Sequence, residues 1–243
     1  MALRLITTSD EKLVGASAVS VLDAGRAASG RALVFVPSLT CGLEVQRELA
    51  AAGLTAGVDC ETPSTWTDLR WALYGDGRSL VTRGLRPVLM SLVAAGHEMA
   101  PLDGGEGTVA LLCDVVARAL PWLPAAGERA SLTAGEARAL DLTDAYAQAL
   151  AEKGFVEPCE ATSLLPAMMG EQGAPVPPCV FLGFDEFNRV TRELICALAR
   201  LGEVTVFVRV LEGEASGRAL ASAGELREVA VAAGIEVIDE VVT

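Results

Sequence analysis

The chain has 243 residues, of which 51% are hydrophobic, and its formal net charge is −13. This length allows one large domain, or one domain with a sizeable insertion. The acidic balance argues against a self-sufficient nucleic-acid binder, which would carry a basic patch. No apolar run approaches the roughly 20 residues that span a bilayer, and the first residues indicate a strand and not a signal peptide. We therefore expect a cytoplasmic protein that makes no membrane contact.

Strand-like and helical patterns alternate at the start of the chain. Short apolar runs at residues 3–7, 32–37 and 58–61 predict three strands, and the second has the composition of a buried parallel strand. Helical patterns at 13–28 and 42–52 lie between them. This βαβαβ order predicts an open parallel sheet with helices on both faces.

The middle of the chain differs, because residues 64–170 contain no convincing strand pattern. Helical patterns recur at 65–74, 83–95, 108–120 and 133–153, and the last opens with a capping box formed by Thr133 and Glu136. A segment rich in glycine and proline follows at 170–178. We therefore expect an all-helical insertion over residues 64–174.

The α/β pattern then returns. Residues 179–183, 203–210 and 235–238 are expected strands. Asn188 is expected to cap a helix that runs to residue 200, and a second capping box, formed by Ser222 and Glu225, is expected to open a helix that runs to residue 233. The fold class is therefore α/β, with one sheet domain built from residues 1–63 and 175–243.

Cysteine and histidine usage gives no sign of a metal site. The six cysteines form no Cys-x-x-Cys pair and lie mostly in apolar stretches, which is typical of buried, reduced thiols. His97 is the single histidine of the sequence, and a lone histidine without a placed nucleophile supports neither a catalytic triad nor a metal cluster. We expect no metal site and no catalytic residue.

The connection after the first strand is where a phosphate-binding loop would lie. Such a loop needs glycines, so that backbone N–H groups wrap the phosphates, and a Gly-Lys-Ser/Thr end. The segment offers Thr8, Ser9 and Lys12 but lacks this pattern, and Asp10 and Glu11 would repel an anion. It predicts either a degenerate nucleotide site or an ordinary strand–helix connection.

A second candidate for nucleotide chemistry is the acidic pair Asp185 and Glu186. The pair follows an apolar strand, as in a Walker B site, where an aspartate holds Mg²⁺ and a glutamate orients a water. Acidic pairs are also common in turns. Without a working phosphate loop, these residues predict at most a degenerate site.

Hydroxyl side chains follow two further strands. Ser38 and Thr40 come after the strand at 32–37, and Thr62 and Ser64 follow the strand at 58–61, with Trp66 close behind. Hydroxyls and free N–H groups at helix starts can hold nucleic-acid phosphates, and an aromatic ring can stack on a base. The alternatives are simple helix caps for the hydroxyls and a core position for the tryptophan.

The order of these segments resembles the N-terminal, helicase-like domain of an AddB-type subunit, from the AddAB/RexAB helicase–nucleases of the PD-(D/E)XK nuclease family. The run from Val36 to Thr40 and the Glu44-x-x-Arg47 helix are similar to the segment after that family's phosphate loop. Residues 62–69 with 74–78 resemble its next conserved block. Residues 182–193 resemble its later strand, Gly-Phe pair and helix.

The resemblance implies a RecA-like, P-loop NTPase-like domain whose helical insertion corresponds to the 1B region of superfamily 1 helicases. The parent would process double-strand DNA ends for recombinational repair together with an AddA-type helicase subunit. The family's nuclease and iron–sulfur cysteines lie outside the matching region, so no cysteine here is assigned to a cluster. Because the phosphate loop is lost, we expect no ATP hydrolysis, and neither ATP nor Mg²⁺ as a cofactor.

The chain is therefore interpreted as a non-catalytic, helicase-like scaffold that holds single-stranded DNA within a complex and docks against the partner subunit. Ser38, Thr40, Thr62, Ser64 and Trp66 are the expected DNA-facing residues. Two alternatives stay open. One is an active nucleotide-binding ATPase that uses the acidic pair, and the other is a free-standing α/β protein that binds a small molecule.

Overall fold

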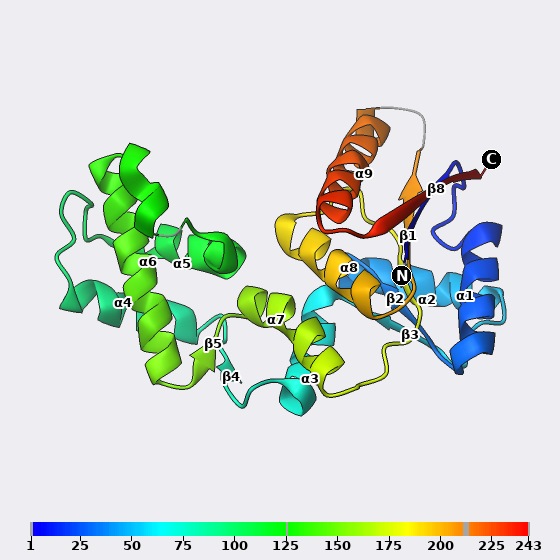
Figure 1. The fold of residues 1–243 in the computed structure, drawn as a ribbon, viewed down its shortest axis with the longest axis horizontal. Helices are drawn as coiled ribbons and strands as arrows, with labels where there is room; N and C mark the ends of the chain where they lie inside the picture. Colours follow the sequence, from blue (N-terminus) through cyan, green and yellow to red (C-terminus); the bar gives the residue numbers. More distant parts are fainter. Residues whose placement is uncertain (1, 125, 211–213, 243) are drawn as a thin grey trace. The chain divides into compact units, whose positions relative to one another are not determined.

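The structure, a computed structural model, describes residues 2–124, 126–210 and 214–242. The described residues form two compact units, one built from 1–66 and 166–243 and the other from 67–165. The first unit holds a six-stranded sheet, all parallel, in the order β3-β2-β6-β7-β1-β8 (Figure 1). Its strands are Ala2–Thr8 (β1), Ala32–Phe35 (β2), Val58–Glu61 (β3), Cys179–Phe181 (β6), Val204–Arg209 (β7) and Glu236–Val242 (β8).

Helices cover both faces of this sheet, as the βαβ pattern predicted. Helices α1 (Ala16–Ser29) and α2 (Leu39–Ala51) pack on the face that carries Ile6 and Val34, where they bury a continuous apolar cluster. Helices α8 (Arg189–Leu201) and α9 (Glu214–Ala232) contact the strands β1, β7 and β8. The side chains of β2 are buried on both faces, which explains why that strand is a continuous apolar run.

The first strand lies among the last ones. β1 pairs with β7 on one side and β8 on the other, with Leu3 opposite both Val204 and Val237. Two strands, β6 and β7, therefore separate β1 from β2. The crossover from β1 to β2 spans both, and this places α1 over the middle of the sheet.

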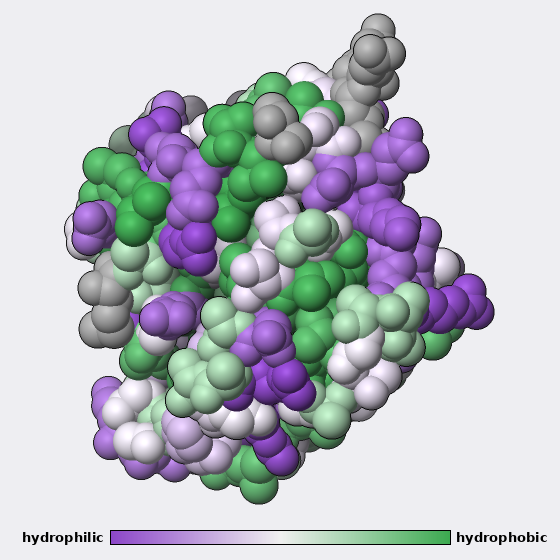
Figure 2. All heavy atoms as spheres, turned by 90° about the vertical axis from the view of Figure 1, so that its right-hand side faces the viewer, coloured by the Kyte–Doolittle hydropathy of each residue, from purple (hydrophilic) through white to green (hydrophobic). Residues whose placement is uncertain are grey.

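Part of the α1 face stays open at the amino ends of the strands. A hollow of about 750 Å³ lies there, lined by Ala24 and Ala28 of α1 and by Arg4 and Thr205 of the sheet, among others. Figure 2 faces the side of the molecule where Figure 1 draws α1 and β8, and it shows apolar surface framed by hydrophilic side chains. This hollow lies at the sheet edge opposite to the carboxyl ends of the strands.

The second unit is mainly helical. Its core forms between α4 (Leu85–Gly96), α5 (Glu106–Ala119) and α6 (Ala134–Glu152). The capping box at the start of α6 is confirmed, because Thr133 N donates to Glu136 Oε2 at 2.8 Å and Glu136 N donates to Thr133 Oγ1 at 3.3 Å. Two 3₁₀ turns, Leu120–Trp122 and Ala126–Ser131, connect α5 to α6.

A buried ion pair ties this core together. Glu157 is fully buried, and the Arg86 guanidinium donates to its carboxylate from Nε at 2.9 Å and from Nη2 at 2.8 Å. Tyr146 Oη donates to the same carboxylate at 2.6 Å. Hydrogen bonding to Glu157 raises the pKa of Arg86, whereas burial is the main reason that the pKa of Tyr146 is raised. The carboxylate therefore joins α4 and α6 to the chain that precedes α7.

The middle segment differs from the expectations in three ways. The insertion is not all-helical, because the two-residue strands β4 (Ser79–Leu80) and β5 (Phe155–Val156) pair in parallel. Helix α7 (Pro158–Glu171) was missed. The boundaries at 63/64 and 174/175 also differ from those found, since the units meet at 66/67 inside α3 (Pro63–Tyr74) and at 165/166 inside α7. Secondary structure thus continues through both boundaries, which a change in composition cannot reveal.

The cap of α8 is confirmed, while the second expected capping box does not exist. Asn188 Oδ1 accepts from Thr191 N at 2.9 Å. Ser222, by contrast, lies in the middle of α9, and its hydroxyl accepts from Phe187 N at 2.7 Å. A tertiary partner therefore replaces the local one that the motif suggested.

The described part of the chain has no helix that is both long and apolar enough to cross a membrane. All six cysteines are free thiols, in keeping with the expectation from their spacing. Four of them are buried, and burial raises the pKa of the Cys159 thiol to about 12 and those of Cys60 and Cys196 to about 11. The four buried thiols are core residues, whereas Cys41 and Cys60 are half-buried against the core of the sheet unit. No group of cysteine, histidine or acidic side chains within the described ranges is arranged to hold a metal.

Candidate functional site at the carboxyl edge of the sheet

The parallel sheet brings the candidate residues to one edge. Because all six strands run in the same direction, the segments after β1, β2, β3 and β6 all leave the sheet at its carboxyl edge. This is the edge at which open α/β sheets place ligands. The phosphate-loop candidate, the acidic pair and both hydroxyl clusters follow those four strands, so topology gathers all of them there.

The loop between β1 and α1 is held by protein groups. Asp10 N donates to Thr8 Oγ1 at 3.1 Å, and Val14 N donates to Glu48 Oε2 of α2 at 2.6 Å. The guanidinium of Arg209 donates to the Glu11 carbonyl at 3.0 Å. Two backbone N–H groups of this loop, those of Asp10 and Val14, are thus already bonded within the domain and are not free to bind a phosphate.

The start of α1 already has an anion beside it. A Cβ atom added to Gly15, the N-cap of α1, would lie 1.8 Å from Oδ2 of Asp10. The Asp10 carboxylate therefore lies beside Gly15, next to the helix N-terminus that favours a phosphate in nucleotide-binding proteins, and it accepts no cap hydrogen bond from α1. Lys12 is exposed and forms no ion pair within the part of the chain that the structure describes. A phosphate at this position would have to displace a carboxylate.

Close packing fills the edge between β1, β2 and β6. Gly183 has a φ of 77°, and a Cβ there would lie 2.7 Å from Cys41 Sγ and 3.3 Å from Leu13 Cδ2. Only glycine fits such a position without strain. Burial, followed by the charge of Glu44, raises the pKa of Cys41. The loops after the three strands therefore pack closely against one another at this edge.

The acidic pair, Asp185 and Glu186, lies in a turn between two buried phenylalanines. Phe184 and Phe187 are buried on either side of it, with ring centroids 5.7 Å apart. Asp185 and Glu186 are exposed, and Glu186 lies 3.9 Å from Arg218. Sequence reasoning singled out the acids and missed the phenylalanines, although their spacing was a usable sign of an anchored turn.

The hydroxyl candidates divide into exposed and buried groups. Ser38 is exposed and caps α2, with its Oγ accepting from Cys41 N at 3.2 Å, while Thr40 and Ser64 are also exposed. Thr62 is buried, and its Oγ1 accepts from Thr65 N at 3.1 Å as the cap of α3. Three hydroxyls can therefore meet a ligand at the surface.

Trp66 is a core residue, which corrects its expected role in stacking on a base. Its side chain is 1% exposed, and it meets Phe35 edge to face with ring centroids 5.8 Å apart. The ring fills the space beneath the end of β2, so a base cannot reach it. Burial likewise removes Thr62 from the accessible set.

Acidic charge was expected at this edge, whereas its exposed apolar surface was not foreseen. Carboxylates outnumber cations around it, with Lys12 and Arg209 as the basic groups near the loop. The first turns of α2 expose Leu39 and Leu43, at 74% and 58%. These residues are four apart and therefore lie on the same helix face. The edge thus combines hydroxyls, acidic groups and an exposed leucine pair.

No family model matches the chain, and no curated protein matches it.

Proposed function

We propose that the chain is a RecA-like domain that does not use ATP and acts as a helicase-like scaffold in a helicase–nuclease subunit that processes double-strand DNA ends. The observation that carries the proposal is the carboxylate of Asp10 at the N-terminus of α1. A domain that keeps the strand–loop–helix of a nucleotide site, and places an anion where phosphate would bind, is suited to support and not to hydrolysis.

The strand order supports the finer fold assignment. In the Rossmann order the first and second strands are neighbours. Here β6 and β7 lie between β1 and β2. The acidic pair follows β6, and a single strand, β7, separates β6 from β1. A single strand between the phosphate-loop strand and the acidic strand is the arrangement expected of a RecA-like sheet.

The exposed groups at the carboxyl edge support a role in positioning DNA. Ser38, Thr40 and Ser64 can hydrogen-bond to phosphates without reading sequence. The exposed pair Leu39 and Leu43 beside them suits docking against an AddA-type partner. Since the edge is acidic, most of the affinity for DNA would come from basic surfaces of that partner, and this chain would orient the strand.

Binding of fluorescein-labelled oligothymidylate to the whole chain, followed by anisotropy at low ionic strength, tests the DNA role. We expect weak binding that falls with salt, and a several-fold loss when Ser38, Thr40 and Ser64 are replaced together by alanine. The matched control is Thr55→Ala, an exposed threonine before β3 at the opposite edge. An unchanged affinity in the triple variant, or an equal loss in the control, would refute the assignment of these hydroxyls.

Titration of the chain with Mg-ATP in a calorimeter tests the scaffold role. We expect no saturable heat, because a nucleotide phosphate would meet the Asp10 carboxylate. Saturable binding by the unmodified chain, abolished by Asp185→Asn, would overturn the proposal in favour of an ATPase that uses the acidic pair.

A further inference from the structure

The hollow of about 750 Å³ on the α1 face of the sheet is a candidate binding site that lies away from the carboxyl edge. Its volume falls within the range of pockets that hold small organic ligands. The residues that line it belong to the sheet unit, and they lie on α1 or toward the amino ends of the strands. The hollow is therefore separate from the hydroxyls that carry the proposed DNA role.

The register of the strands sets the floor of the hollow. Arg4 of β1 is paired with Thr205 of β7 on one side and with Ile238 of β8 on the other, and Thr205 is paired in turn with Val180 of β6. Paired residues of neighbouring parallel strands point to the same face of a sheet. Val180 packs in the apolar cluster beneath α1, so this row of four side chains faces α1.

Helix α1 forms a wall of small side chains. Val21, Ala24 and Ala28 line the hollow from this helix. Between them, Gly25 approaches the start of β6, where an added Cβ would lie 3.1 Å from Cβ of Pro178. The helix is therefore held close to the sheet at one point, while its small side chains leave the space beside that point open.

The hydroxyl of Thr205 is the feature that indicates a ligand. The residue is 4% exposed and lines the hollow. Within the described ranges, its Oγ1 makes no hydrogen bond, and the oxygen is not sealed inside the protein, so it opens on the hollow. A buried polar group without a partner costs stability, and valine would fill the same space without that cost. The hydroxyl thus contributes little to folding and can be satisfied by a bound molecule.

The guanidinium of Arg4 supplies a second donor next to this hydroxyl. Its Nε and Nη2 atoms donate to the two carboxylate oxygens of Glu240, each at 3.0 Å. This bidentate pair orients the guanidinium and neutralises its charge. Nη1 donates to no protein group in the part of the chain that the structure describes. The floor therefore offers two donors without a net charge.

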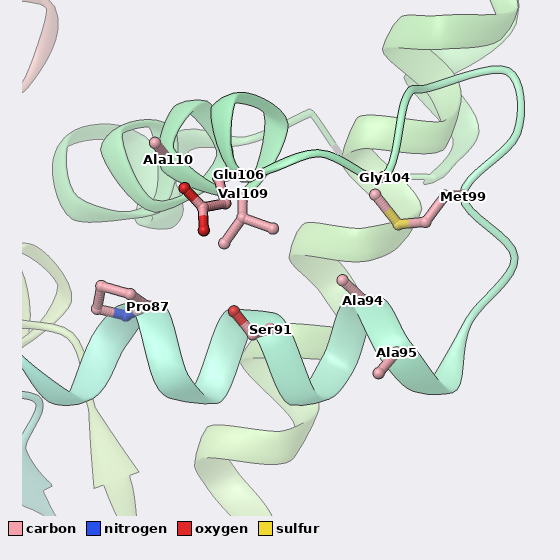
Figure 3. A pocket seen from close by; sticks show the side chains of 9 residues that line it. All are labelled: Pro87, Ser91, Ala94, Ala95, Met99, Gly104, Glu106, Val109 and Ala110. Carbon is pink, nitrogen blue, oxygen red and sulfur yellow. The ribbon is translucent and has the colours of Figure 1, made fainter.

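The hollow of about 530 Å³ between α4 and α5 in the helical unit offers no comparable group (Figure 3). The residues that line it are exposed or half-buried, and its polar side chains, Ser91 and Glu106, are exposed to solvent. Water can satisfy both of them. Only the hollow on the α1 face combines a buried floor with an unpartnered polar group among the hollows compared here.

We propose that the hollow on the α1 face binds a neutral organic carbonyl compound. The apolar body would pack on the floor and on α1, while the carbonyl oxygen accepts from Thr205 Oγ1 and from Arg4 Nη1. A carbonyl oxygen has two lone pairs and can accept both bonds. The exposed carboxylates of Glu203 and Glu236 lie at the amino edge beside the hollow and would repel an anion. A cation would meet donors at the floor and not acceptors.

The test uses four probes that share a phenyl-alkyl body: 4-phenyl-2-butanone, butylbenzene, phenylbutyrate and phenylbutylamine. Binding to the whole chain is followed by calorimetry and by NMR of the valine and isoleucine methyl groups. We expect saturable binding of the ketone, with shifts at Val180 and Ile238, and binding of the carboxylate and of the amine at least roughly tenfold weaker. Butylbenzene measures the apolar contribution alone.

Two variants locate the site. Thr205→Val keeps the shape and removes the hydroxyl, so the affinity for the ketone should fall about fivefold or more, while that for butylbenzene is unchanged or rises. Its melting temperature should equal or exceed that of the unmodified chain. Ala24→Leu fills the hollow and should abolish binding of both probes. The matched control is Thr143→Val, a threonine that is 1% exposed in the helical unit and donates to the Leu140 carbonyl at 2.8 Å.

Four results would overturn the proposal. An unchanged affinity of Thr205→Val for the ketone would mean that the hydroxyl is not used. A fall in melting temperature as large as that of Thr143→Val would assign the hydroxyl a structural role. Self-association of the chain that Ala24→Leu abolishes would make the hollow a protein contact. Absence of saturable binding by any probe would remove the site, and it would leave the DNA-scaffold proposal untouched, because that proposal depends on the carboxyl edge.

Discussion

Replacing Arg86 by methionine should be among the most damaging single changes in the helical unit. The side chain of Glu157 is fully buried and that of Arg86 is 15% exposed, so the substitution leaves a buried carboxylate without its cation. Removing one partner of a buried ion pair typically costs about 3 to 5 kcal/mol. The remaining hydrogen bond from Tyr146 offsets only part of this cost. We expect the free energy of unfolding to fall within that range.

Urea denaturation of the whole chain, followed by circular dichroism, measures the effect. The control is Arg118→Met, because Arg118 pairs with Asp114 four residues earlier on the same helix, with side-chain exposures of 77% and 56%. Exposed pairs of this kind contribute about 0.5 kcal/mol or less.

A second substitution separates loss of charge pairing from loss of packing. If Glu157 is replaced by methionine in the Arg86→Met background, the buried charge disappears and much of the lost stability should return. The reasoning fails if Arg86→Met costs no more than Arg118→Met, or if the double variant is less stable than Arg86→Met alone.

The remaining predictions concern the thiols, one strained turn and one tertiary hydrogen bond. Because burial raises the pKa of Cys159 to about 12 from 9.0, the native thiol keeps its proton to higher pH than the unfolded one. Stability is therefore fully present below about pH 9 and is lost as the pH rises toward the folded pKa, by about 1.4 kcal/mol per pH unit for this thiol. Cys159→Ala should reduce that alkaline slope in urea titrations, and an unchanged slope would contradict the assignment. Gly183→Ala should cost more than Gly53→Ala, since both positions have a positive φ but only the first would press a Cβ against a neighbour. The left-handed backbone alone costs about 1 to 2 kcal/mol at either position. Equal losses of stability in thermal melts would therefore show that the Cys41 side chain can move aside without cost. Ser222→Ala should cost about 1 to 3 kcal/mol by leaving the buried N–H of Phe187 without an acceptor, and a near-neutral melt would show that water replaces the hydroxyl.

The parallel strands could be predicted because a strand that is buried on both faces of a sheet has a continuous apolar sequence. β2 and β7 are almost entirely buried, so they appear as continuous apolar runs of the right length. Helix α7 was missed because it contains Pro166 and shows a weak apolar periodicity. β4 and β5 have two residues each, which is too short for any alternation to show.

The location of the site could be predicted from the sequence, but not which of its side chains are accessible to a ligand. Parallel topology fixes which loops share the carboxyl edge, and the sequence identifies those loops. Whether Trp66 faces a ligand or Phe35 depends on packing between distant segments, which leaves no local pattern. The contact between Asp10 and Gly15 is equally invisible, because it depends on the path of the loop between them. The prediction of a capping box at Ser222 was wrong for a similar reason, because the backbone N–H of Phe187, remote in sequence, donates to that hydroxyl.

The position of β1 sets an order of events during synthesis. Both of its neighbours, β7 and β8, begin only at residues 204 and 236, so β1 has no partner until those residues have left the ribosome. Residues 67–165, by contrast, form a continuous segment whose helices contact one another locally. Local contacts form faster than pairings between distant segments. The helical unit can therefore complete its fold while the sheet waits, and a nascent chain that stops before residue 204 would carry a finished helical unit beside an apolar strand with nothing to pair with.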